Sequence, residues 1–264
     1  MVRKEAFGCE KVPVTVFQDS DDLSRDVAHH IAALIAHKAE AGENCVLGLA
    51  TGSSPIRVYK ELVSLHKQGR LSFRNVVTFN LDEYCGLQAD DLQSYHHFMH
   101  VHLFDHISDI NPTNIHIPDG TLAKAADISR FCKEYEAAIR AAGSIDLQLL
   151  GMGRMGHIGF NESGSERHTR TRAVYLDRVT RVDAASDFFG ELHVPRRAIT
   201  MGIATILEAR EIILLAFGEN KTSTVAKAVE GPVSPNVPAS FLQEHPNAMF
   251  YLDEASCAGS PLDP

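Results

Sequence analysis

Short apolar runs and longer amphipathic runs alternate along most of the chain. The short runs have the length of strands and lie at 14–17, 45–50, 76–80, 115–117, 145–150, 212–217 and 248–252. The longer runs carry apolar residues at helical spacing and lie at 20–41, 54–68, 94–107, 125–142 and from Lys221 onwards. The second of these helices is expected to take Ser54 as its N-cap and Pro55 in its first turn.

This alternation predicts an α/β fold: a doubly wound, mostly parallel sheet with helices on both faces, in a Rossmann-like arrangement. No linker or internal repeat divides the chain, so residues 1–264 are expected to form a single domain. Residues 151–211 show little regular pattern, and the small, polar tail 255–264 is expected to fray. Ligands bind such sheets at the carboxyl ends of the strands, so the residues after each strand are the candidates for chemistry.

Composition excludes several classes of partner. The net charge of −9 argues against a nucleic-acid partner, because phosphate backbones are bound by basic surfaces. The five cysteines contain no CxxC pair, so neither a disulfide framework nor a zinc site is predicted, and Cys45 is expected in the core. No apolar run has the length of a membrane span or resembles a signal peptide, which predicts a cytoplasmic protein without a membrane partner.

Two of the strand–helix junctions carry polar residues suited to chemistry. The first, ATGSSP at 50–55, has small residues that let backbone N–H groups approach an anion at a helix N-terminus. A tight turn explains this junction equally well. The second places Asp82 and Glu83 directly after the run 76–80, where burial and like charge would raise the pKa of one carboxyl group. A solvated acidic turn is the alternative there.

The other two junctions contain a histidine and a lysine. His157 lies in a glycine-rich segment after the run 145–150, and imidazole exchanges protons near neutral pH; Glu162 is a candidate to orient it. A histidine satisfied by the local backbone is the alternative. Lys221 follows the run 212–217 and is a candidate to bind a phosphate, although most such lysines are simply solvated.

Two further motifs are rejected as functional sites. Residues 151–156 (GMGRMG) match GxGxxG, but the segment that follows lacks the apolar stripe of a dinucleotide-binding helix. The pairs His96/His100 and His102/His106 have the i,i+4 spacing of metal ligands. The stripe formed by Tyr95, Met99, Leu103 and Ile107 explains that helix as amphipathic packing, so no metal site is predicted.

Taken together, the junctions resemble the glucosamine-6-phosphate deaminase (isomerase) family. The matching segments, in chain order, are GLATGSSP, VVTFNLDEYCGL, SYHHFM, GHIGFNE, PRRAITMGIATIL and the lysine of AFGENK. The resemblance implies isomerisation of glucosamine 6-phosphate with loss of ammonia, without a cofactor, and it leaves a homo-oligomer open. It also implies roles for residues at matching positions: catalytic Asp82, His157 and Glu162, and substrate- or phosphate-binding Thr51, Gly52, Ser53, Ser54, Glu83 and Lys221.

The sequence departs from the family pattern at three places. The family usually has an aspartate where Met155 stands, a proline where Ser163 stands, and a phosphate-binding arginine just before the paired phenylalanines, where this chain has Ser186-Asp187. Candidates to replace that arginine are Arg172, Arg181, Arg196 and Arg197. Two other functions therefore stay open: a 6-phosphogluconolactonase-type hydrolase, and a sugar-phosphate sensor that has lost its catalytic activity.

Overall fold

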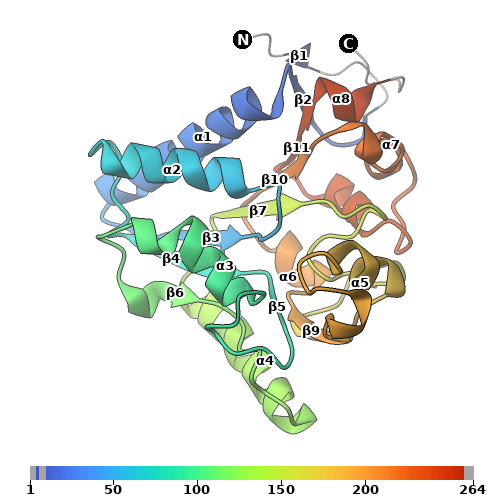
Figure 1. The fold of residues 1–264 in the computed structure, drawn as a ribbon. Helices are drawn as coiled ribbons and strands as arrows, with labels where there is room; N and C mark the ends of the chain where they lie inside the picture. The colour runs from blue at the N-terminus through green and yellow to red at the C-terminus, as the bar shows by residue number, and fades with distance from the viewer. Residues whose placement is uncertain (1–3, 6–9, 259–264) are drawn as a thin grey trace.

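An eight-stranded, mostly parallel sheet forms the centre of the protein in the computed structural model, which describes residues 4–5 and 10–258 (Figure 1). In spatial order its strands are β1 (Lys4–Glu5), β2 (Val14–Phe17), β11 (Ala248–Asp253), β10 (Glu211–Ala216), β7 (Leu147–Gly151), β3 (Cys45–Leu49), β4 (Val76–Asn80) and β6 (Ile115–His116). The short β1 pairs with β2 in the antiparallel direction, and the pairs from β2 to β6 are parallel.

Helices cover both faces of this sheet, which confirms the doubly wound prediction. One face packs against α1 (Ser20–Glu40), α2 (Ile56–Lys67) and α3 (Tyr95–His102), and the other against α4 (Ala125–Ala141), α6 (Ile203–Leu207) and α7 (Thr222–Val229). Successive residues of β3 alternate between the two cores: Val46 joins the second group of helices and Leu47 the first. A strand buried on both faces needs apolar residues at every position, and this is why its sequence is apolar throughout.

The predicted elements are present, with differences at their ends. Pro55, rather than Ser54, is the N-cap of α2, and no side chain caps this helix, so the prediction of a Ser54 cap was wrong. Helix α3 ends at His102 and is followed by a short 3₁₀ turn, Phe104–His106, before Ile107. None of the helices in the described part of the chain is long and apolar enough to cross a membrane.

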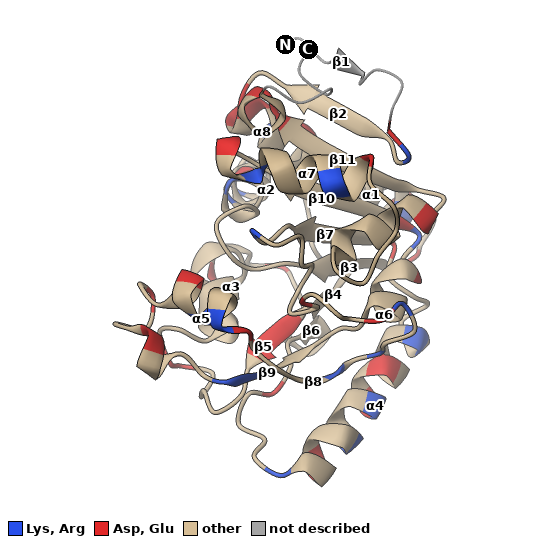
Figure 2. Cartoon of the chain, turned by 90° about the vertical axis from the view of Figure 1, so that its right-hand side faces the viewer, with Lys and Arg blue, Asp and Glu red and all other residues tan. Residues whose placement is uncertain are grey.

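The stretch predicted as irregular contains two strands of a second, three-stranded antiparallel sheet, so that prediction was wrong. The strands of this sheet are β5 (Asp82–Tyr84), β9 (Arg197–Thr200) and β8 (Arg172–Tyr175), in that spatial order, and α5 (Arg178–Ala184) follows β8. These strands are short, and β8 is only partly buried, so they lack the apolar runs that revealed the main sheet. Figure 2 shows β5 between the main sheet and β9.

The prediction that the tail frays from residue 255 was also wrong for its first part. Asp253 caps the short helix α8 (Glu254–Cys257) by accepting a hydrogen bond from the Ser256 N–H, and Ser256 and Cys257 are buried. Residues 259–264 lie outside the described residues. Cys45 is buried as predicted, and Cys9 is not among the described residues.

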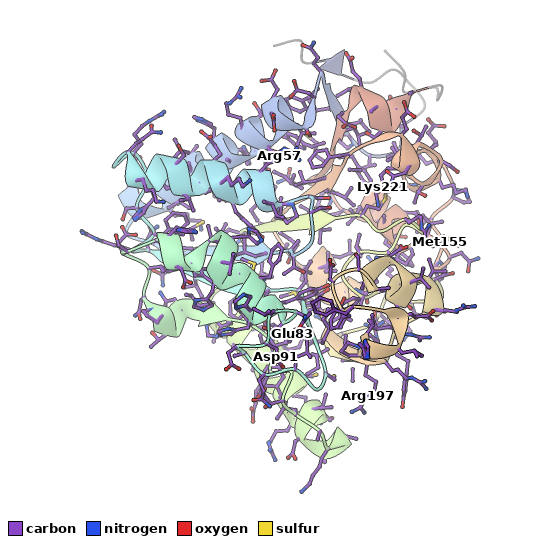
Figure 3. All side chains as sticks on the ribbon, in the orientation of Figure 1. Arg57, Glu83, Asp91, Met155, Arg197 and Lys221 are labelled. Carbon is purple, nitrogen blue, oxygen red and sulfur yellow. The ribbon has the colours of Figure 1, made fainter. Side chains whose placement is uncertain are left out.

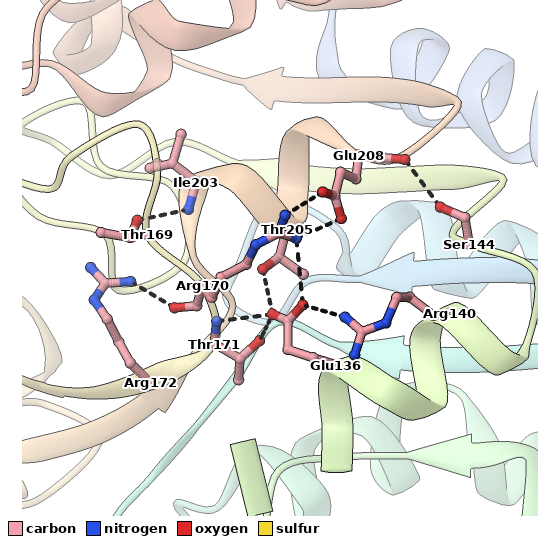
Figure 4. A network of polar contacts seen from close by, with 10 residues as sticks. All are labelled: Glu136, Arg140, Ser144, Thr169, Arg170, Thr171, Arg172, Ile203, Thr205 and Glu208. Atoms are coloured by element: carbon pink, nitrogen blue, oxygen red, sulfur yellow. Dashed lines mark hydrogen bonds and ion pairs between the residues drawn. The ribbon is translucent and has the colours of Figure 1, made fainter. Parts of the chain in front are cut away.

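A buried polar network joins α4, the residue before β8, and α6 beside the second sheet (Figure 4). Glu136 accepts hydrogen bonds from the N–H and the hydroxyl of Thr171, at 2.9 and 2.6 Å, and from the hydroxyl of Thr205. Its carboxylate also pairs with Arg140 and Arg170, at 3.8 and 3.6 Å. A buried carboxylate is costly unless it is paired and hydrogen-bonded, and these partners meet that requirement. The network holds the strand β8 against the main body.

Candidate active site

The four strand–helix junctions that carry the candidate residues lie together at one edge of the main sheet. The strands that precede them, β10, β7, β3 and β4, are consecutive neighbours in the sheet. After β3 the chain builds the sheet toward β6, whereas after β7 it builds toward β11, so the switch in direction falls between β3 and β7. Loops on the two sides of such a switch point diverge and leave a crevice at the carboxyl ends of the strands.

A cavity of about 620 Å³ opens at this position. Its walls include the loop after β3, the start of β5, the glycine-rich loop after β7, helix α5 and the loop after β10. The lining residues predicted from the sequence are Thr51, Gly52, Ser53, Ser54, Asp82, His157 and Lys221. Glu83 and Glu162 lie close by but do not line it.

Asp82 is buried at the wall of the cavity, with 5% of its surface exposed. It begins β5 and pairs with Thr200 of β9, so the second sheet holds it. Burial, together with the negative charge of Glu83, raises the pKa of Asp82 to about 8. Gly159 packs against the same group: a Cβ atom there would lie 2.9 Å from the Thr200 Oγ1 and 3.2 Å from the Asp82 Oδ2.

Glu83 points away from the cavity and anchors the start of α3. Its carboxylate accepts hydrogen bonds from the backbone N–H groups of Tyr84, Tyr95 and His96, at 2.8, 3.0 and 2.9 Å. Burial raises the pKa of Glu83 to about 7, and these three hydrogen bonds oppose that rise. Figure 3 labels Glu83. We infer that Glu83 affects the cavity through its charge and its hold on β5.

His157 reaches the cavity from the glycine-rich loop, with its ring directly over Gly153. A Cβ atom at Gly153 would lie 2.0 Å from both the Cε1 and the Nε2 of His157, so no larger residue fits there without moving the ring. Gly153 is therefore needed to seat the histidine. Burial, and then the charge of Lys221, lowers the pKa of His157 to about 4, against the opposing charges of Asp183 and Asp177. The imidazole is neutral at pH 7.

Glu162 is buried and fixes the segment that leads into α5. Its Oε2 accepts a hydrogen bond from the N–H of Asp177, the residue before this helix, at 2.7 Å. Burial raises the pKa of Glu162. Its orienting effect on His157 stays a prediction, since the hydrogen bond of its carboxylate goes to the residue before α5.

Lys221 borders the cavity and supports the glycine-rich loop. Its Nζ donates a hydrogen bond to the carbonyl of Met152 at 2.8 Å, and burial is the main cause that lowers its pKa. Thr51 to Ser54 face it from the loop after β3, with Gly52 in the left-handed region at φ +87°. This combination of small residues, hydroxyls and a lysine fits a small anion.

None of the four arginines proposed from the sequence lines this cavity. Arg172 hydrogen-bonds to the Asn161 side chain at 2.9 Å, and Arg181 donates to the carbonyl of Leu176. Arg196 and Arg197 border a separate cavity of about 210 Å³. The arginine that does line the main cavity is Arg154, which sequence reasoning missed.

Arg154 and Asp183 were both missed as cavity residues. Arg154 occupies a variable position of the rejected GxGxxG match. Its place shortly after the end of a predicted strand could have marked it as a candidate cavity residue. Asp183 lies in the stretch predicted as irregular, so nothing in the sequence placed it near a strand end. The structure brings the two together as an ion pair at the wall of the cavity.

The histidine-rich helix forms local contacts instead of a metal site. The rings of His96 and His100 stack with their centroids 4.6 Å apart, and the Nδ1 of His100 hydrogen-bonds to Asp105 at 2.8 Å. Within residues 4–5 and 10–258, no group of three or more His, Cys, Asp or Glu side chains is arranged to hold a metal ion.

A doubly wound sheet with a polar cavity at its switch point defines an α/β enzyme of the class that binds a small molecule at the strand ends. The sequence matches the family of glucosamine-6-phosphate isomerases and 6-phosphogluconolactonases over residues 18–251. The chain belongs to this family.

Two relatives within this family are named glucosamine-6-phosphate deaminases. The chain is 48% identical over 256 residues to a glucosamine-6-phosphate deaminase of Rhodopirellula baltica, covering 97% of this chain and 98% of that protein. It is 49% identical over 225 residues to glucosamine-6-phosphate deaminase 2 of Bacillus subtilis, covering 84% and 88% of the two chains.

Solved structures agree with this placement. A monomeric glucosamine-6-phosphate deaminase superposes with a TM-score of 0.88 at 40% identity, over 93% of this chain and 98% of the other. A 6-phosphogluconolactonase from Trypanosoma cruzi superposes with a TM-score of 0.75 at 20% identity, over 96% and 98% of the two chains. The second likeness shows a shared fold.

Proposed function

We propose that the protein converts glucosamine 6-phosphate into fructose 6-phosphate and ammonia. The observation that carries the proposal is that Asp82 and His157 line one cavity, together with Lys221 and the loop Thr51 to Ser54. The names of the relatives described above support the same reaction. Neither a metal nor a cofactor takes part in the proposed mechanism.

The proposed mechanism begins with opening of the sugar ring. Neutral His157 takes the proton from the O1 hydroxyl and returns a proton to the ring oxygen, which breaks the bond between C1 and that oxygen. Ionised Asp82 then removes the proton from C2 while the ammonium group at C2 gives a proton to O1, which forms an enolamine. The proton held by Asp82 is then delivered to C1. The resulting imine at C2 is attacked by water, and ammonia leaves as the ketone of fructose 6-phosphate forms. In this scheme Ser53, Ser54 and Lys221 hold the phosphate.

Ammonium release from glucosamine 6-phosphate by the purified protein tests the proposal. The native chain is expected to release ammonium and to form one fructose 6-phosphate for each ammonium. Hydrolysis of 6-phosphogluconolactone is measured beside it. Lactone hydrolysis without ammonium release would point to the hydrolase instead, and binding of sugar phosphates without either reaction would point to the sensor.

The pH dependence of the reaction is expected to reflect the ionisation of the Asp82 carboxyl group. Because the proposed base must be ionised and its pKa is raised to about 8, kcat/KM should fall as the pH drops below about 8. In Glu83→Gln this fall should move to lower pH, since the charge of Glu83 is the second cause of the raised pKa and burial, the first, remains.

Profiles of kcat/KM between about pH 5.5 and 9.5 for the native protein and the variant would measure this shift. The exposed Asp90→Asn in the loop that follows should keep the native profile. An unchanged or upward-shifted profile in Glu83→Gln would contradict the assignment of Asp82 as the base.

We also propose that the chain forms a single domain, residues 1–264, and that it works in the cytoplasm on a phosphorylated amino sugar. One solved relative is described as monomeric, and a homo-oligomer of this chain is the alternative that light scattering of the full chain would reveal.

A further inference from the structure

Arg154 and Asp183 place a pair of opposite charges at the wall of the main cavity. Arg154 extends from the glycine-rich loop after β7, and Asp183 extends from α5. Both line the cavity, and their side chains form an ion pair. The pair is exposed, with 51% and 41% of the surface of the two side chains accessible, so water screens it and the pair contributes little to stability. A stronger anion can therefore displace Asp183 from the guanidinium.

The backbone of Arg154 is held firmly while its side chain reaches outward. Thr224 of α7 donates a hydrogen bond to the Arg154 carbonyl at 2.8 Å, and Lys221 donates to the Met152 carbonyl in the same loop. Figure 3 shows Met155, the neighbour of Arg154, and Lys221 on the same side of the molecule. The loop thus has a fixed base from which the guanidinium can change partner.

Arg154 and Lys221 are also close enough for their charges to repel. After burial, the charge of Arg154 is a further cause that lowers the pKa of Lys221, whereas the charge of Asp183 raises it. Two cations that line one cavity repel each other, and an anion bound between them relieves that repulsion. A phosphate group with about two negative charges at neutral pH is a suitable anion, and guanidinium binds its oxygens in a bidentate way.

We propose that Arg154 is the second cation of the phosphate subsite, and that Asp183 holds its guanidinium until a phosphate takes its place. The inference rests on the proposed function, because it assigns the phosphate of that substrate to Lys221 and Arg154. It makes Asp183 a competitor of the phosphate, so the two members of one ion pair have opposite effects on binding. An ion pair that only stabilised α5 would give effects of the same sign.

Binding of inorganic phosphate to the full chain, measured by titration calorimetry at constant ionic strength, tests the proposal. Arg154→Gln is expected to raise the Kd about tenfold, since a charge-assisted contact is lost. Asp183→Asn is expected to lower the Kd by about threefold or more, because the guanidinium is freed and a nearby negative charge is removed. Arg178→Gln is the matched control: Arg178 is exposed on the same helix, pairs with Glu191 and does not line the cavity.

Opposite shifts in the two variants, with an unchanged control, would support the proposal. Weaker binding in both variants, unchanged binding in Arg154→Gln, or no phosphate binding by the native chain would overturn it. Circular dichroism checks the fold, and Arg154→Lys, which keeps the charge, should bind phosphate more tightly than Arg154→Gln. Phosphate binding can be measured without turnover, so the two proposals can fail separately. Opposite shifts in Kd without ammonium release by the native chain would refute only the proposed function. Ammonium release without the opposite shifts in Kd would refute only the inference about Arg154 and Asp183.

Discussion

Asp82→Asn is expected to lower kcat for ammonium release by about 10²- to 10⁴-fold, the range that a positioned general base contributes. An amide cannot accept the proton from C2, and the described cavity offers no second carboxylate that is buried to the same degree. Asp183 and Asp187 also line the cavity, but both are exposed, and the first pairs with Arg154. Initial rates at saturating substrate would measure the loss.

The same variant is expected to fold and to be more stable than the native protein at pH 8. The pKa of Asp82 is about 8 in the folded protein and ordinarily 3.8, so folding favours its protonated form. That contribution to stability is fully present below about pH 4 and is lost as the pH rises through about 8. Asparagine cannot ionise, so the difference in Tm between variant and native should grow from pH 4 to pH 8.

Exposed Asp90→Asn is the matched control for both measurements, and it should change neither kcat nor Tm by more than a small amount. Turnover by a folded Asp82→Asn close to the native rate would remove Asp82 from the mechanism. A loss of turnover together with lower stability at pH 8 would show that the carboxyl group has a structural role instead.

Gly153→Ala is expected to lower kcat/KM by about 10²-fold or more, although it adds a single methyl group far smaller than the substrate. The new Cβ atom would lie 2.0 Å from two atoms of the His157 ring, so the imidazole must leave its position. A shift of about 1 Å in a catalytic group is enough for a loss of this size. Steady-state kinetics would measure the effect, and a crystal structure of the variant would show where the ring goes.

Gly151→Ala, at the last residue of β7, provides a control two residues before Gly153. A Cβ atom at Gly151 would meet only the Ser54 side chain, at 3.7 Å, which is an ordinary contact. This variant should therefore keep most of the activity. Equal losses in the two alanine variants would mean that this segment tolerates no added side chain at either position, and that displacement of the His157 ring is not the cause.

Much of the fold followed from local pattern. Strands buried on both faces, such as β3, need apolar residues at every position, and the helices between them carry one apolar stripe. Both patterns can therefore be recognised in the sequence. The second sheet could not be predicted in this way. Its strands are short, and β8 is partly exposed, so the pairing of Asp82 with Thr200 depends on contacts between segments far apart in the chain.

The candidate site divides along the same line. The chain itself determined that Asp82, His157, Lys221 and the loop after β3 follow strands, and parallel strands bring their carboxyl ends to one edge. Only the tertiary structure decided which polar groups face the cavity. Glu83 hydrogen-bonds to the start of α3, Glu162 hydrogen-bonds to the residue before α5, and Arg154 forms an ion pair with Asp183. The positions of the strands along the chain follow from local pattern, whereas side-chain partners, burial and pKa depend on atoms that folding brings together from distant segments.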